Sequence, residues 1–235
     1  MTLNINQHKN ILISILKDIY TDTTLGPLLG FKGGTAAALF YELPRFSVDL
    51  DFDLLDAAQA DAVFEKVQKI VEGYGEIKRL NKKRYTLFML LSYDEKAMNI
   101  KVEINTRSFG SKYELKNYLG ISMLVMNQPD MVAHKLVAMM ERLGDTNRDI
   151  FDVWYFLKQR WEINTKIIEQ RTALSFTDFL QKVIAALEKF DDRSILAGMG
   201  DLLDNKQKAW VKAHLKNDVI FQLKLLSDLQ KQPTA

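Results

Sequence analysis

The sequence predicts an α+β fold, in which a small mixed β-sheet with flanking helices is followed by an all-α C-terminal part. Before residue 126, several short runs alternate apolar with polar residues, which is typical of strands with one buried face. Apolar residues at helical spacing are interleaved with these runs, and from Pro129 onward only the helical spacing continues. We therefore expect an α+β core in residues 1–125 and a helical domain in residues 126–235.

The elements of the first part are predicted in chain order. Apolar residues that recur every three or four positions indicate an amphipathic helix over about residues 5–20. Asp56 and Gln59 resemble a capping box that opens a helix, and Gly73 closes it. The other expected elements are a short strand at 28–32, a short helix at 35–42, an acidic strand at 47–53, β-rich runs at 76–80, 85–93 and 99–106, and an ambiguous segment at 113–126 that reads as a mixture of strand and loop.

The second part is predicted to be helical throughout. Its helices are expected near residues 129–143, 148–160, 176–190 and 206–230, with a shorter one between them.

Composition excludes several classes of protein. The chain has 235 residues, of which 47% are apolar and 26% charged, so it can bury a sizeable core. It contains no cysteine, which excludes a disulfide framework and cysteine-ligated zinc and fits a reducing compartment; we expect a cytoplasmic protein. No apolar run approaches the roughly 18 residues of a membrane span, and the polar residues near the N-terminus are unlike a signal peptide.

The most informative stretch joins a Gly-Gly turn to a series of alternating acids. Lys32-Gly33-Gly34-Thr35 precedes a short predicted helix, and Asp49, Asp51 and Asp53 alternate with Val48, Leu50 and Phe52. On a strand the three acids share one face, where a cation such as Mg²⁺ would relieve their mutual repulsion. Glycines at a helix N-terminus let phosphate oxygens approach backbone N–H groups, and the Ser47 hydroxyl or N–H could join them. The alternatives are a solvent-facing edge strand and an ordinary loop.

Glu103 is the candidate third carboxylate of this site. It alternates with Val102 and Ile104, so it shares a strand face with Lys101 and Asn105. If this strand lies beside the acidic strand, Glu103 is placed to act as a general base on an attacking hydroxyl. The alternative is a surface charge on an antiparallel sheet.

Two groups of charged residues occur in the helical part. Lys135, Met139 and Arg142 lie at i, i+4 and i+7 and form one stripe. Lys135 could reach a triphosphate, and Arg142 could add to that contact or pair with a carboxylate; the alternative is a solvated cationic face. We expect Lys135→Ala to weaken nucleotide use and leave the fold intact. Asp149 and Asp152 share one face of the next helix, where Asp149 suits the helix dipole.

A run of five cations in the first part is a second candidate surface. Net charge is only +2, so the whole chain does not resemble a nucleic-acid binder. Locally the run could grip an RNA or DNA backbone, or simply form a solvated hairpin. It consists of Lys78, Arg79, Lys82, Lys83 and Arg84.

Taken together, these motifs resemble the AbiEii/AbiGii-toxin-type nucleotidyltransferases of the DNA polymerase β-like superfamily. They follow the order found in that family and span about residues 30–157, whereas the helices beyond residue 160 carry no matching motif. The likeness rests on Lys32-Gly33-Gly34-Thr35-Ala36, Tyr41-x-Leu43-x-Arg45-x-Ser47-x-Asp49-x-Asp51-Phe52, Lys135-Leu136-x-Ala138 and Arg148-Asp149-x-x-Asp152.

The resemblance implies a role for each group of residues. Asp49, Asp51 and Glu103 would hold Mg²⁺, or alternatively Mn²⁺, at a two-metal site. Asp149 or Asp152 would orient the Lys135 region or the base. Asp53 has no fixed counterpart in the family pattern, and we interpret it as a supporting group at the end of the strand. The residues expected to bind the NTP are Lys32, Gly33, Gly34, Thr35, Ser47, Lys135 and Arg142.

The resemblance also implies an activity and partners. An acceptor hydroxyl would attack the α-phosphate of an NTP, and pyrophosphate would leave. Relatives act as toxins of toxin–antitoxin and abortive-infection systems, and some add nucleotides to the 3′ end of tRNA, so we expect a tRNA acceptor and a cognate antitoxin. The alternatives are transfer to a small molecule or protein side chain, and a non-catalytic module that binds a partner.

Overall fold

The computed structural model describes residues 4–231, and the chain divides into two compact units, Met1–Asn127 and Gln128–Ala235. The first unit is a seven-stranded mixed sheet with helices on both faces, and the second unit is helical. The α+β prediction is therefore confirmed. Within the described residues, no helix has both the length and the apolar character needed to cross a bilayer.

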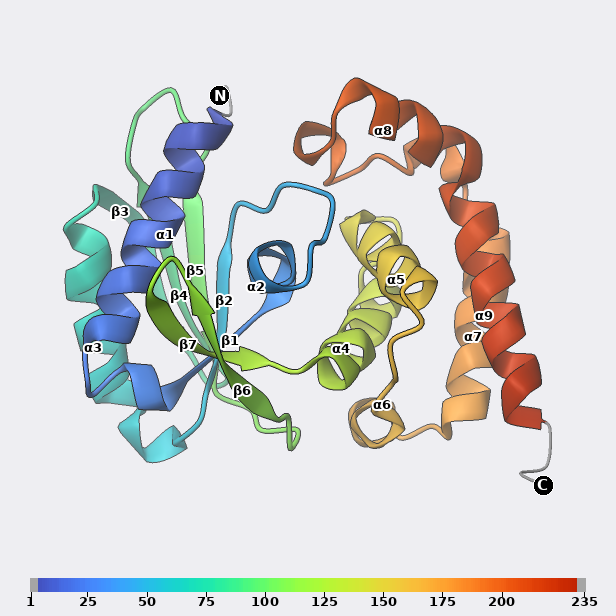
Figure 1. The fold of residues 1–235 in the computed structure, drawn as a ribbon, viewed down its shortest axis with the longest axis horizontal. Helices are drawn as coiled ribbons and strands as arrows, with labels where there is room; N and C mark the ends of the chain where they lie inside the picture. The colour runs from blue at the N-terminus through green and yellow to red at the C-terminus, as the bar shows by residue number, and fades with distance from the viewer. Residues whose placement is uncertain (1–3, 232–235) are drawn as a thin grey trace. The chain divides into compact units, whose positions relative to one another are not determined.

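The sheet of the first unit has the strand order β3-β4-β5-β2-β1-β7-β6 (Figure 1). Its central strands β5, β2, β1 and β7 combine parallel and antiparallel pairs, since β2 runs parallel to β5 and antiparallel to β1. The strands are β1 (Leu29–Lys32), β2 (Leu50–Leu54), β3 (Glu76–Lys83), β4 (Thr86–Ser92), β5 (Ile100–Asn105), β6 (Tyr113–Tyr118) and β7 (Ile121–Met126).

Helices cover the two faces of the sheet differently. On one side lie α1 (Ile5–Thr21) and α3 (Ala60–Glu72), while α2 (Gly33–Phe40) packs on the other side, mainly against β1, β2 and β6 (Figure 1). The apolar residues of the alternating strands, including Phe52, Val102 and Met89, are buried on the side of α1 and α3. Strand periodicity therefore sends the acids to the face that carries α2.

Two local expectations differ from the structure. The acidic strand begins at Leu50, so Ser47 and Asp49 lie in the irregular segment before it and not within the predicted strand 47–53. The undecided segment 113–126 is a β-hairpin, whose strands β6 and β7 are joined through Leu119 and Gly120. Both of these residues have positive φ, as a tight type I′ turn requires.

The second unit consists of helices, as predicted, and β7 ends at Met126 immediately before it. The helix Asn205–Trp210 continues through a π-helical turn, Val211–Leu215, into the last helix. The helices are α4 (Gln128–Glu141), α5 (Arg148–Lys158), α6 (Thr165–Thr172), α7 (Phe176–Lys189), α8 (Asn205–Trp210) and α9 (Lys216–Lys231).

Candidate active site

A row of polar residues crosses the centre of the sheet on the face that carries α2, which we call the acid face. Asp51 of β2 lies directly opposite Glu103 of β5 on one side and opposite Lys32 of β1 on the other. Directly paired residues point to the same face of a sheet, and neighbouring strands are about 4.8 Å apart. The strand of Glu103 thus does lie beside the acidic strand, which was the condition for a role of Glu103 in the site, and Asp51 and Glu103 are neighbours.

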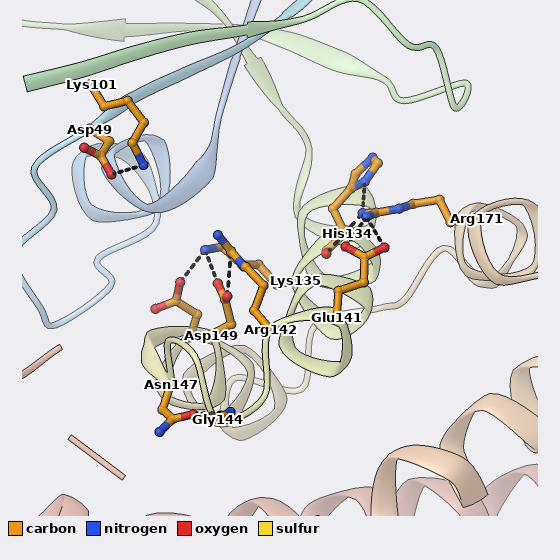
Figure 2. Close-up of polar contacts among 11 residues, drawn as sticks. Asp49, Lys101, His134, Lys135, Glu141, Arg142, Gly144, Asn147, Asp149 and Arg171 are labelled. Carbon is orange, nitrogen blue, oxygen red and sulfur yellow. Dashed lines mark hydrogen bonds and ion pairs between the residues drawn. The ribbon is translucent and has the colours of Figure 1, made fainter. Parts of the chain in front are cut away.

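Asp49 lies just ahead of this row. Its Oδ2 atom is 3.6 Å from Nζ of Lys101, the residue of β5 that precedes Val102 (Figure 2). The Thr35 hydroxyl of α2 donates to the backbone carbonyl of Asp49, so Thr35, predicted to bind nucleotide, ties α2 to the acidic segment. Over residues 4–231, no three His, Asp or Glu side chains already converge as ligands of a metal ion. The acids thus share a face without forming a closed cluster.

The Gly-Gly turn lies against the acids. Gly33 has a φ of +79°, and a Cβ atom built there would overlap the Oδ2 atom of Asp51. A Cβ atom on Gly34 would lie 2.8 Å from both the Arg45 Nη2 and Ser47 Oγ atoms. The missing side chains therefore leave the backbone at the start of α2 directly beside Asp51.

This donor set fits a hard divalent cation. Carboxylate oxygens are the ligands that Mg²⁺ and Mn²⁺ prefer, and Mg²⁺ needs only one or two of them besides water and phosphate oxygens. A side chain at position 33 would overlap the Asp51 Oδ2 atom, so the glycine leaves that space open. Asp49, Asp51 and Glu103 are the residues that would hold the ion.

The third alternating acid, Asp53, is occupied by a network of its own. Its carboxylate accepts hydrogen bonds from Lys32 Nζ at 2.6 Å, Asn105 Nδ2 at 2.8 Å and the Tyr113 hydroxyl at 2.5 Å. Burial raises the pKa of Asp53, but the Lys32 ammonium and these hydrogen bonds outweigh it and hold the pKa below its ordinary value. Lys32, predicted to bind nucleotide, is therefore an ion-pair partner of Asp53 in this structure.

In the second unit, Lys135 of α4 is held between two buried carboxylates of α5. Its Nζ atom is 2.9 Å from Oδ1 of Asp149 and 2.6 Å from Oδ2 of Asp152, and both aspartates are fully buried. Nη2 of the half-exposed Arg142 lies 2.5 Å from the other Asp149 oxygen (Figure 2). Lys135 is itself buried. The idea of a solvated cationic face is therefore wrong for Lys135, because α5 supplies two buried counter-charges.

A family model described as "Nucleotidyl transferase AbiEii toxin, Type IV TA system" matches residues 14–214 of the chain. The chain belongs to this AbiEii family. It is thus a nucleotidyltransferase toxin of a type IV toxin–antitoxin system, with an antitoxin as its counterpart and an NTP as its implied substrate.

Two crystal structures from Helicobacter pylori share the fold of this AbiEii protein. The first, described as a candidate nucleotidyltransferase, is 18% identical with a TM-score of 0.59, and the match covers 96% of this chain and 99% of the other. The second, JHP933, is also 18% identical, with a TM-score of 0.55 and coverage of 98% and 97%. No curated protein matches the chain.

Two buried residues of the AbiEii protein support the acidic segment and were not predicted as site residues. Arg45 donates from Nη1 to the Phe46 carbonyl at 2.8 Å and borders Gly34. His8 of α1 contacts the Val48 carbonyl through Nε2 at 3.0 Å and the Tyr93 hydroxyl through Nδ1 at 2.9 Å. Arg45 could have been found as a cation within the glycine–acid motif, whereas His8 lies 40 residues from its partner and leaves no local signal.

The run of five cations lies on the β3–β4 hairpin, as the hairpin interpretation expected, but the hairpin separates its members. Lys78 pairs with Glu76 at 2.5 Å beside an irregularity in the β3–β4 register, and Lys82 pairs with Asp61. Arg84 lies over the Tyr85 ring at 4.9 Å. The run is therefore not one continuous cationic surface.

Proposed function

We propose that this AbiEii-family protein transfers a nucleoside monophosphate from an NTP to the terminal hydroxyl of a tRNA 3′ end. The observation that carries the proposal is the row formed by Asp51 and Glu103, with the Gly33 turn directly against Asp51. In the reaction, the acceptor oxygen forms a bond to the α-phosphorus and the bond from that phosphorus to pyrophosphate breaks.

The residues of the acid face have separable roles in this proposal. Asp49, Asp51 and Glu103 would hold Mg²⁺, which when bound would neutralise charge on the phosphates. The backbone N–H groups that begin α2 at Gly33 and Gly34 would bind phosphate oxygens. Glu103 would take the proton of the attacking hydroxyl, since a general base must lie within hydrogen-bond reach of the proton it removes.

Lys135 and Arg142 would serve as phosphate contacts. A lysine ammonium has three N–H donors, and two of those of Lys135 serve Asp149 and Asp152. These two carboxylates would orient Lys135 so that the third donor can serve a phosphate.

The deciding experiment incubates the purified protein with each labelled NTP, Mg²⁺ and total RNA. We expect label in tRNA for the wild type and a loss of at least about 100-fold for Asp51→Asn, in line with the removal of a transition-state contact. Asp61→Asn is the matched control, because Asp61 is an exposed acid that pairs with Lys82; it should retain activity. Label that enters only protein or a small molecule would refute the tRNA acceptor, and no transfer at all would refute the proposed function.

A further inference from the structure

The acid face continues beyond Glu103 toward the β3 edge of the sheet. Across β5, β4 and β3, Glu103 lies opposite Phe88, which lies opposite Asn81. One row earlier, Lys101 lies opposite Leu90, which lies opposite Arg79. Since directly paired residues share a face, Phe88, Leu90 and Arg79 lie on the acid face.

These three residues form what we call the platform: Arg79, Phe88 and Leu90. Phe88 and Leu90 are half-buried and Arg79 is exposed, whereas the alternate residues Leu87, Met89 and Leu91 are fully buried on the side of α3. The Arg79 guanidinium lies over the Phe88 ring, 5.9 Å from its centroid. An accessible ring and a guanidinium thus lie together on the same face as the carboxylates.

Arg79 differs from the neighbouring lysines of the hairpin in the sheet face on which it lies and in the group that it contacts. Lys82 lies opposite the buried Leu87, so it belongs to the α3 side, where Asp61 neutralises it. Lys78 is neutralised by Glu76. Arg79 instead lies on the acid face within cation–π distance of the Phe88 ring, an arrangement that suits a binding surface for planar, anionic ligands.

We propose that the platform binds the unpaired terminal nucleotide of a single-stranded RNA end and thereby presents the acceptor. Bases released from a duplex stack on aromatic rings and on guanidinium planes, and arginine also binds phosphate. Phe88 is one strand spacing, about 4.8 Å, from Glu103, so a nucleotide stacked there brings its sugar hydroxyls toward this carboxylate. That a sugar hydroxyl of this nucleotide is the acceptor rests on the proposed function, whereas the binding of the RNA end to the platform does not.

The test measures binding without NTP, by fluorescence anisotropy of a labelled RNA duplex with a single-stranded 3′ overhang. We expect Arg79→Gln and Phe88→Leu each to weaken binding about tenfold, the loss expected for one stacked base. Arg79→Gln should also reduce the slope of log affinity against log salt by about 0.7 to 0.9. Lys82→Gln removes the same charge from the opposite face and should bind the RNA like the wild type.

The controls separate this proposal from the proposed function. Thermal unfolding checks that the variants fold, and Phe88→Leu keeps apolar volume at a half-buried position. Asp51→Asn should bind the overhang normally. If the wild type transfers no nucleotide but the variants bind RNA as expected here, the proposed function is refuted and the platform is not. Three outcomes would overturn the platform. The first is wild-type RNA affinity in both Arg79→Gln and Phe88→Leu, and the second is a wild-type protein that binds a blunt duplex as tightly as the overhang. The third is a variant with weakened affinity for NTP and unchanged affinity for RNA.

Discussion

At the residue scale, Lys135 shows how a single cation can balance two buried charges. Its ammonium is the shared counter-charge of two fully buried aspartates, Asp149 and Asp152. Ions taken out of water lose several kcal/mol of hydration each, and the loss is offset only while the partner is present. Removal of Lys135 would leave the half-exposed Arg142 as the compensating cation seen beside Asp149.

We therefore predict that Lys135→Ala lowers the free energy of unfolding by about 3–5 kcal/mol, the cost of breaking a buried ion pair. This replaces the expectation, drawn from the helical stripe, that the fold would be unaffected. Urea denaturation measures the effect. Lys224→Ala, which breaks the exposed pair of Lys224 with Glu188, is the control and should cost no more than about 1 kcal/mol. Equal losses in the two variants would contradict the prediction.

At the element scale, the turn from β1 into α2 depends on a glycine for two separate reasons. Gly33 has positive φ, which costs an L-residue roughly 1–2 kcal/mol, and a Cβ atom there would overlap the Asp51 carboxylate. Gly110 shares only the first of these two features: its φ is +69°, but a Cβ atom there would meet nothing within 4 Å. A comparison of the two glycines therefore distinguishes backbone strain from the close approach to Asp51.

We predict that Gly33→Ala and Gly110→Ala lose similar backbone stability, about 1–2 kcal/mol, while only Gly33→Ala loses transfer activity. The added Cβ atom must displace the Asp51 carboxylate, and small misplacements of a reacting group can cost about 100-fold in rate. Steady-state transfer rates together with urea denaturation of both variants measure the two effects. Full activity in Gly33→Ala would show that the close approach to Asp51 is dispensable.

The elements also show which parts of the site a sequence can predict. Alternation correctly separated Asp51 from Leu50 and Phe52 within its strand, because side-chain direction along a strand is a local property. That Glu103 lies opposite Asp51 depends on the pairing of β2 with β5, which alternation left as a condition. The division of the five cations was not predictable, since it depends on the hairpin register, on the irregularity near Lys78 and on Asp61 of α3. Likewise, a helical stripe cannot reveal that the Lys135 ammonium meets carboxylates from another helix.

At the scale of the whole molecule, the buried titratable groups set how stability responds to acid. Burial lowers the pKa of His8, although the Val48 carbonyl and Asp49 partly oppose that shift. Burial raises the pKa of Asp53, but the Lys32 ammonium and the hydrogen bonds from Lys32, Tyr113 and Asn105 outweigh burial and lower it. Both groups therefore bind protons more readily in the unfolded chain than in the folded one.

It follows that stability should fall as the pH falls, because the unfolded state takes up the extra protons. The His8 contribution is lost as the pH drops below about 6.5, and the Asp53 contribution as it drops below about 3.9. Urea denaturation at a series of pH values should show His8→Gln with a shallower loss between pH 6.5 and pH 5 than the wild type. A wild-type stability that rises between pH 7 and pH 5 would refute the prediction.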